Sequence, residues 1–180
     1  MKILDKEMVA EKYLDMLEIA VAATKFCGYE SKEYSTMIKS DKEDKGSWFR
    51  VIFAQRYDQD LNEQTYYLST TIKLDDDNTS IASIHVNKYL GYFAGSIDKM
   101  SGKFEGHAET SETDTYFSPN NNGELEVTTV TTEHRGHTNN GIAYDSSSEK
   151  TEVYEFDGNW KNLSSDMPKK GQENNTKVIK

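Results

Sequence analysis

The feature that most constrains the fold is a long part of the chain in which apolar and polar residues alternate with a period of two. From Trp48 onward, this alternation runs through the segments WFRVIFAQRY, TYYLSTTIKL and SIASIHVNKY. Successive side chains of a β-strand point to opposite faces of a sheet, so the pattern predicts strands that each bury one face. The short acidic linkers YDQDLNEQ and DDDNT between them predict an antiparallel meander of core strands over residues 48–100.

Three longer segments rich in threonine follow, over residues 103–157. They are KFEGHAETSETDTYF, GELEVTTVTTEH and IAYDSSSEKTEVYEF, and the strong turn signals SPNNNG and HTNNG separate them. We expect three consecutive antiparallel strands that are long enough to project beyond the core as a ribbon. The segment FDGNWKN then predicts a tight turn that returns Trp160 to the core.

An amphipathic helix is predicted over residues 6–26, within the segment 1–28. Val9, Tyr13 and Met16 begin a broad apolar stripe with charged residues opposite, and Gly28 is a natural stop. Residues 29–47 are expected to form a polar connector, and residues 164–180 a disordered polar tail. The sequence therefore predicts one α+β domain over residues 1–163, in which an N-terminal helix packs on a curved antiparallel sheet with a long acidic hairpin extension.

Two features of the sequence predict where the protein resides. Its first twenty residues carry acidic residues and have no uninterrupted apolar run, so we expect neither a signal peptide nor a membrane span. The single cysteine, Cys27, cannot form an internal disulfide, which agrees with a reducing compartment. We therefore expect a cytoplasmic protein in which Cys27 is a buried structural thiol.

The net charge of −10 is concentrated in the predicted ribbon. Between Phe104 and Asp157 there are twelve acidic residues and only two basic ones, Arg135 and Lys150, so this segment accounts for the whole net charge. An acidic surface argues against direct binding to DNA or RNA, because contacts to phosphates need Lys and Arg. It favours a basic protein as the partner, since opposite charges steer two proteins together. A solvated face with no binding role explains the same composition.

The predicted function is that of a small inhibitor that docks its acidic ribbon into the nucleic-acid-binding site of a basic protein such as a nuclease. Such a surface is typical of the nucleic-acid mimics, anti-CRISPR and anti-restriction proteins among them, with which phages and mobile elements evade host defence. An immunity protein that neutralises a basic toxin domain would use the same electrostatics. The predicted contact residues are Glu109, Glu112, Asp114, Glu124, Glu126 and Glu133, with Tyr116 and Arg135 as anchors.

Histidines suggest a different, metal-dependent hydrolase hypothesis. If Phe117 lies opposite Glu124 in the first hairpin, His107 lies directly opposite His134, and a two-residue turn at Asn140-Gly141 would place His137 opposite Tyr144. On a flat strand, however, the two side chains of H-x-x-H point to opposite faces, and convergence requires a bulge at Arg135-Gly136. Without that bulge, the sequence predicts neither a metal site nor a cofactor.

Other catalytic motifs are absent from the sequence. The segment DDDNTS resembles the start of a calcium loop but lacks its glycine and its bidentate glutamate. There is no phosphate-binding glycine loop and no nucleophile motif. We therefore expect a binding protein rather than an enzyme.

Overall fold

The structure is a computed structural model that describes residues 2–4, 11–30, 35–39, 47–56, 64–77, 80–97, 100, 104–137, 143–163 and 175–179. Among them are one α-helix, α1 (Glu11–Phe26), and one antiparallel sheet. The strands are β1 (Lys2–Leu4), β2 (Ser35–Lys39), β3 (Trp48–Arg56), β4 (Gln64–Leu74), β5 (Ile81–Ile97), β6 (Phe104–Pro119), β7 (Glu124–His137), β8 (Ala143–Glu155) and β9 (Asn175–Ile179).

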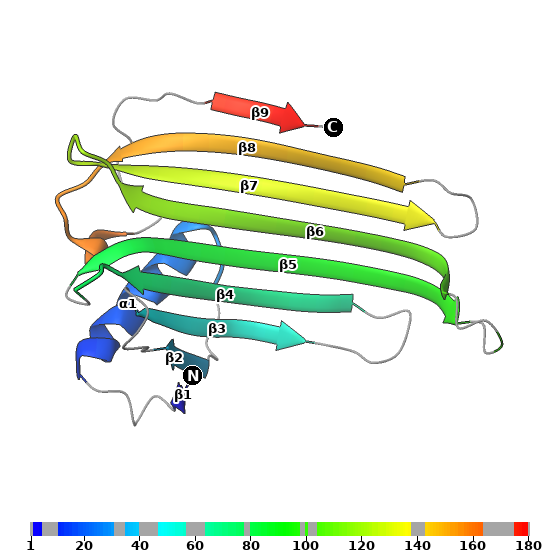
Figure 1. Cartoon of the computed structure of the whole chain (residues 1–180), viewed down its shortest axis with the longest axis horizontal. Coiled ribbons are helices and arrows are strands. Elements are labelled where there is room, and N and C mark those ends of the chain that lie inside the picture. Colours follow the sequence, from blue (N-terminus) through cyan, green and yellow to red (C-terminus); the bar gives the residue numbers. More distant parts are fainter. Residues whose placement is uncertain are drawn as a thin grey trace.

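The sheet is a meander in which every strand pairs with its neighbours in the chain (Figure 1). The predicted helix and antiparallel meander are both present, although residues 6–10 of that helix lie outside the described residues. The three strands predicted over residues 103–157 are β6, β7 and β8, and β6 continues the sheet by pairing with β5 from Phe104 to Phe117.

Three strands lie where the sequence predicts none, and the first, β1, falls within the segment 1–28, for which only the helix was predicted. The polar connector predicted over residues 29–47 contains β2, which pairs with both β1 and β3. The tail predicted as disordered contains β9, which pairs with β8, while residues 164–174 and 180 lie outside the described part of the chain. β1 is three residues long, β2 and β9 are five each, and none carries the strong alternation that marks the central strands.

The helix covers one face of the sheet, which we call the helix side, and the opposite face is here called the open face. Figure 1 shows α1 crossing β3, β4 and β5 near one end of the strands, while the other ends of β5–β8 extend past it. Alternation explains most of the packing, because most buried residues of the strands occupy every second position on the helix side, although Ile52 and Ser69 are buried on the other face. The largest fully buried ones are Phe49, Val51, Leu68, Ile72, Ile84, Val86, Phe117 and Leu125.

Specific contacts fix where the helix lies on the sheet. The Thr24 hydroxyl donates to the Ala20 carbonyl at 2.7 Å, and its oxygen lies 2.6 Å from the Thr70 hydroxyl in the core. Because Thr24 has a single hydroxyl proton, Thr70 is the donor between the two hydroxyls. At the last turn, the Phe26 ring packs edge-on against the rings of Phe117 and Tyr154, each with its centroid 5.4 Å away.

Two turns, one after α1 and one after β8, follow the predictions from the sequence. Gly28 has a φ of +85°, and its N–H donates to the Lys25 carbonyl at 2.8 Å, which ends α1 as predicted. Trp160 begins a short 3-10 helix, is buried, and contacts Phe156. The prediction that Trp160 returns to the core is therefore confirmed.

Replacing Phe117 should be far more damaging than replacing its neighbour Tyr116. Phe117 is fully buried beneath α1, whereas Tyr116 is 44% exposed on the open face. We expect Phe117→Ala to lower the free energy of unfolding by about 3–5 kcal/mol, as for other large core residues. Tyr116→Ala should cost about 1 kcal/mol or less. Urea unfolding followed by circular dichroism measures both, and equal losses would contradict the assignment of the two faces.

Candidate functional site

The register between β6 and β7 decides which side chains can act together, and it differs from the predicted one. His107 lies opposite His137, and His134 lies opposite Thr110. The predicted pairing of His107 with His134 is wrong because Phe117 lies opposite Val127 rather than Glu124, and the strands stay paired up to Pro119 and Leu125 at the turn. Residues that were expected to lie opposite one another, such as His107 and His134, are thus offset by three positions. Because three is an odd number, they lie on opposite faces of the sheet.

Asn120 holds this tight turn. Its side-chain oxygen accepts hydrogen bonds from the backbone N–H groups of Asn122, at 2.9 Å, and Glu124, at 3.0 Å. The Asn120 N–H donates to the Glu124 carbonyl at 2.8 Å, and Gly123 adopts a φ of +75°, which glycine tolerates best. The turn therefore consumes only Asn120–Gly123 and sets the register of the strands that follow.

The predicted histidine site does not form, because the three residues do not share a face. The ladder runs without a break through Gly136, which pairs with Ala108 on one side and Ala143 on the other, so the bulge needed for convergence is absent from this part of the sheet. His134 therefore lies on the open face, whereas the strand positions of His107 and His137 are on the helix side. The side chain of His137 lies outside those that the structure describes.

Each described histidine of the ribbon instead contacts a carboxylate. His134 contacts Asp145 across the strand pair, and His107 lies 3.0 Å from Glu109. The expected pairing of His137 with Tyr144 is also wrong, since Arg135 lies opposite Tyr144. Within the described residues, no group of three or more His, Cys, Asp or Glu side chains converges on a point where a metal ion would fit.

The eight predicted contact residues are divided between the two faces. Glu109, Glu133 and Arg135 lie on the helix side, where the Arg135 guanidinium is 3.5 Å from the Glu109 carboxylate. The other five lie on the open face, and they are Glu112, Asp114, Tyr116, Glu124 and Glu126. No single flat partner can therefore contact all eight.

The division by face separates the charges. Arg135 and Lys150 are the only Arg or Lys residues of β6–β8, and both lie on the helix side, where they contact Glu109 and Glu152 respectively. On the open face of these three strands, the charged side chains besides His134 are all acidic, and they are Glu112, Asp114, Glu124, Glu126, Asp145, Glu149 and Glu155. We call this set the acidic face.

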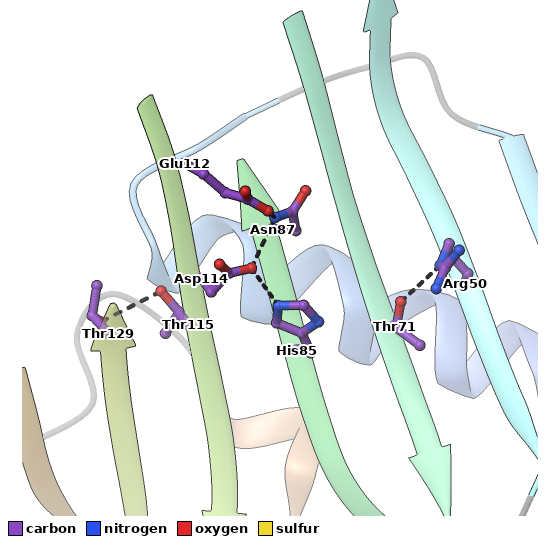
Figure 2. A network of polar contacts seen from close by, with 8 residues as sticks. All are labelled: Arg50, Thr71, His85, Asn87, Glu112, Asp114, Thr115 and Thr129. Carbon is purple, nitrogen blue, oxygen red and sulfur yellow. Dashed lines mark hydrogen bonds and ion pairs between the residues drawn. The ribbon is translucent and has the colours of Figure 1, made fainter. Parts of the chain in front are cut away.

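At its border with β5, the acidic face is anchored by a polar network (Figure 2). Asp114 lies between His85, whose Nε2 is 2.7 Å away, and Asn87, whose amide donates to it at 2.8 Å. The same Asn87 amide also donates to Glu112 at 2.8 Å. One amide thus bridges two carboxylates that lie two residues apart on β6, which holds both side chains in place against their mutual repulsion.

The acidic face influences the pKa of Tyr116, the one tyrosine on the open face of β6–β8. Tyr116 stacks on His85 with ring centroids 4.4 Å apart. Partial burial raises the pKa of Tyr116, and the negative charges of Asp114 and Glu112 raise it further. Asp114 and Glu112 thus create a negative potential on this surface that opposes ionisation of the phenol.

Three members of the acidic face, Asp145, Glu149 and Glu155, are absent from the predicted contact residues. All three lie on β8 and are exposed. Asp145, Glu149 and Glu155 are separated by even numbers of residues, so the sequence predicts that they share one face of their strand. Only the pairing with β7 shows that Glu124 and Glu126 lie on the same face. On β3 and β4, the same open face carries Arg50, held over the Trp48 ring at 4.7 Å, and Lys73.

No family model, curated protein or solved structure matches this chain. Among the described residues, no helix is long and apolar enough to cross a membrane. The assignment of a function therefore depends on the geometry and charge of the acidic face.

The potential of the acidic face can be measured through Tyr116. Asp114→Asn removes a negative charge that disfavours the phenolate, so the pKa of Tyr116 should fall. Glu109→Gln removes a charge from the same strand but on the helix side, and should leave the Tyr116 pKa nearly unchanged. An NMR titration with ¹³C-labelled tyrosine measures both variants. A Tyr116 pKa that is insensitive to Asp114→Asn would show that the two side chains are not neighbours.

Proposed function

We propose that this chain is an inhibitor that binds a basic, nucleic-acid-binding site of another protein through its acidic face. The observation that carries the proposal is the uniform sign of charge on that face. The one Arg and the one Lys of β6–β8 both lie on the helix side. On the acidic face, the exposed side chains include Glu126, Asp145, Glu149 and Glu155. The three strands expected to form the acidic extension supply this surface.

Uniform charge has an energetic cost that solubility alone does not require. Glu124 and Glu155 lie directly opposite one another on β7 and β8, and like charges in such positions destabilise a sheet. A basic partner would relieve this repulsion, and the long-range attraction would speed association. The cost to the free protein and the gain in the complex thus have the same origin.

The arrangement of the carboxylates favours a nucleic-acid-binding site over an arbitrary basic surface. Glu112 and Asp114, and likewise Glu124 and Glu126, are two residues apart on one strand, which spaces them by about 7 Å. These regularly spaced negative charges lie on a stiff sheet. To the basic groove of a partner, they would resemble the row of phosphates along a nucleic-acid backbone. The chain itself has no basic surface on these strands with which to hold phosphates.

The charge of the open face also sets the orientation of the complex. Arg50 and Lys73 on β3 and β4 would repel a basic partner, while β6–β8 attract it. The partner should therefore centre on β7 and avoid the strands near β3. A toxin domain with a basic active site is a partner that satisfies the same orientation.

Charge reversal on the two faces of β7 tests this proposal. Glu126 and Glu133 are both exposed, but Glu126 lies on the acidic face and Glu133 on the helix side. With a panel of purified enzymes that includes CRISPR nucleases, restriction endonucleases and basic nuclease toxins, we expect excess protein to inhibit DNA or RNA cleavage by at least one member.

For that enzyme, the triple variant Glu126→Lys, Glu149→Lys and Glu155→Lys should weaken binding at least about tenfold at low salt, because three attractions become repulsions. Glu126→Lys alone should weaken it more than the matched control Glu133→Lys, and the difference should shrink as salt is added. The proposal fails if no enzyme of the panel is inhibited, or if the two single variants bind equally.

A further inference from the structure

A hollow of about 430 Å³ lies on the helix side, away from the acidic face, where the last turn of α1 meets β6–β8. It forms because α1 ends at Phe26, whose ring covers Phe117 and Tyr154, while the strands continue past it (Figure 1). Beyond these aromatic residues, the side chains of the sheet change from large and apolar to small and hydroxylated. The volume is within the usual range for small-molecule sites, about 300–1,000 Å³.

The floor of the hollow is a set of hydroxyl groups. Thr113 and Thr131 form one cross-strand pair, and Thr115 and Thr129 another, with 3.4 Å between the two hydroxyl oxygens in each. Ser148 on β8 extends the floor. A hydroxyl has one donor and two acceptor positions, so these long hydrogen bonds, and the further one between Thr115 and Cys27, leave each threonine at least one position for a ligand.

Aromatic rings and a thiol form the wall. Phe26, Cys27 and Tyr29 line it from the end of α1. Burial raises the pKa of the Cys27 thiol to about 11, with a hydrogen bond to the Thr115 side chain acting in the opposite direction. The thiol is therefore neutral at pH 7, and the wall offers apolar area and ring faces, while Lys88 lies over the Tyr29 ring at 4.5 Å.

Charge at the rim is balanced. Lys150 contacts Glu152, and these are the two charged side chains that reach the hollow from the helix side of β8. Glu149 also lines the hollow, but its side chain lies on the open face. A charged ligand would have to break the Lys150–Glu152 pair, whereas a neutral one would leave it intact.

We propose that this hollow binds a neutral, polyhydroxylated small molecule, a sugar of one or two rings. The ring hydroxyls would exchange hydrogen bonds with the threonine floor, and the apolar face of the sugar would lie against Phe26 or Tyr29. The site is independent of the acidic face, from which it is separated by the sheet itself.

Titration of the ¹⁵N-labelled full chain with D-glucose, N-acetylglucosamine and maltose tests the proposal by NMR. At least one sugar should give saturable shifts of the amide signals of Thr113, Thr115, Thr129 and Thr131. The double variant Thr129→Val and Thr131→Val removes two hydroxyls with little change of shape, and should raise the dissociation constant about tenfold or more.

The matched control is Thr128→Val and Thr132→Val, which makes the same chemical change on the opposite face of β7. It should bind the sugar as the unmodified protein does, and thermal melting checks that both variants are folded. Saturable binding by none of the three sugars in the millimolar range would overturn the proposal. Equal weakening in both double variants would also overturn it, since the hydroxyls of the hollow would then have no specific role.

Discussion

The hydrogen-bond ladder between β6 and β7 determines which side chains share a face from β6 to β8. Asn120 closes the hairpin with its side chain and thereby sets which residues lie opposite one another. Side chains alternate along a strand, so a register shifted by one residue would exchange the two faces of every strand that follows. It would move Arg135 and Lys150 to the open face and place Phe117 and Val127 on different sides. The core and the acidic face are thus specified by one turn.

The two faces meet different physical requirements. On the helix side, Phe117, Leu125 and Tyr154 bury apolar area against the end of α1, and threonines take over where the helix no longer covers the sheet. On the open face of β6–β8, threonine and valine lie between the acidic residues, and a few hydrogen-bonding groups reduce the repulsion between carboxylates. Asn87 and His85 on β5 hold Glu112 and Asp114, so the repulsion is largest on β7 and β8, where a basic partner would have most to gain.

The sequence predicts the elements of this fold better than the relations between them. Alternation identifies β3–β8, and the apolar stripe with Gly28 identifies the end of α1, because burial imposes those periods directly. The burial of Trp160 is predicted because this residue follows the turn signal in FDGNWKN. The strands β1, β2 and β9 are missed because they are short and gain their stability from neighbours rather than from their own pattern. For the candidate site, the concentration of acids is visible in the sequence, but their separation from Arg135 and Lys150 is not. That separation depends on the register of the hairpin, in which Phe117 pairs with Val127, three residues beyond the assumed partner Glu124.

Disulfide trapping of the β6–β7 register tests the central claim most directly, in a background with Cys27→Ser. Residues directly opposite on antiparallel strands have Cα atoms about 4.5–5.5 Å apart, which suits a disulfide. The variant Thr110→Cys with His134→Cys should therefore oxidise readily to an intramolecular disulfide, seen by mass spectrometry and by a mobility shift without reductant. The variant His107→Cys with His134→Cys should remain reduced, since those side chains lie on opposite faces. The reverse result would place Arg135 among the open-face carboxylates and contradict the existence of a uniformly acidic face.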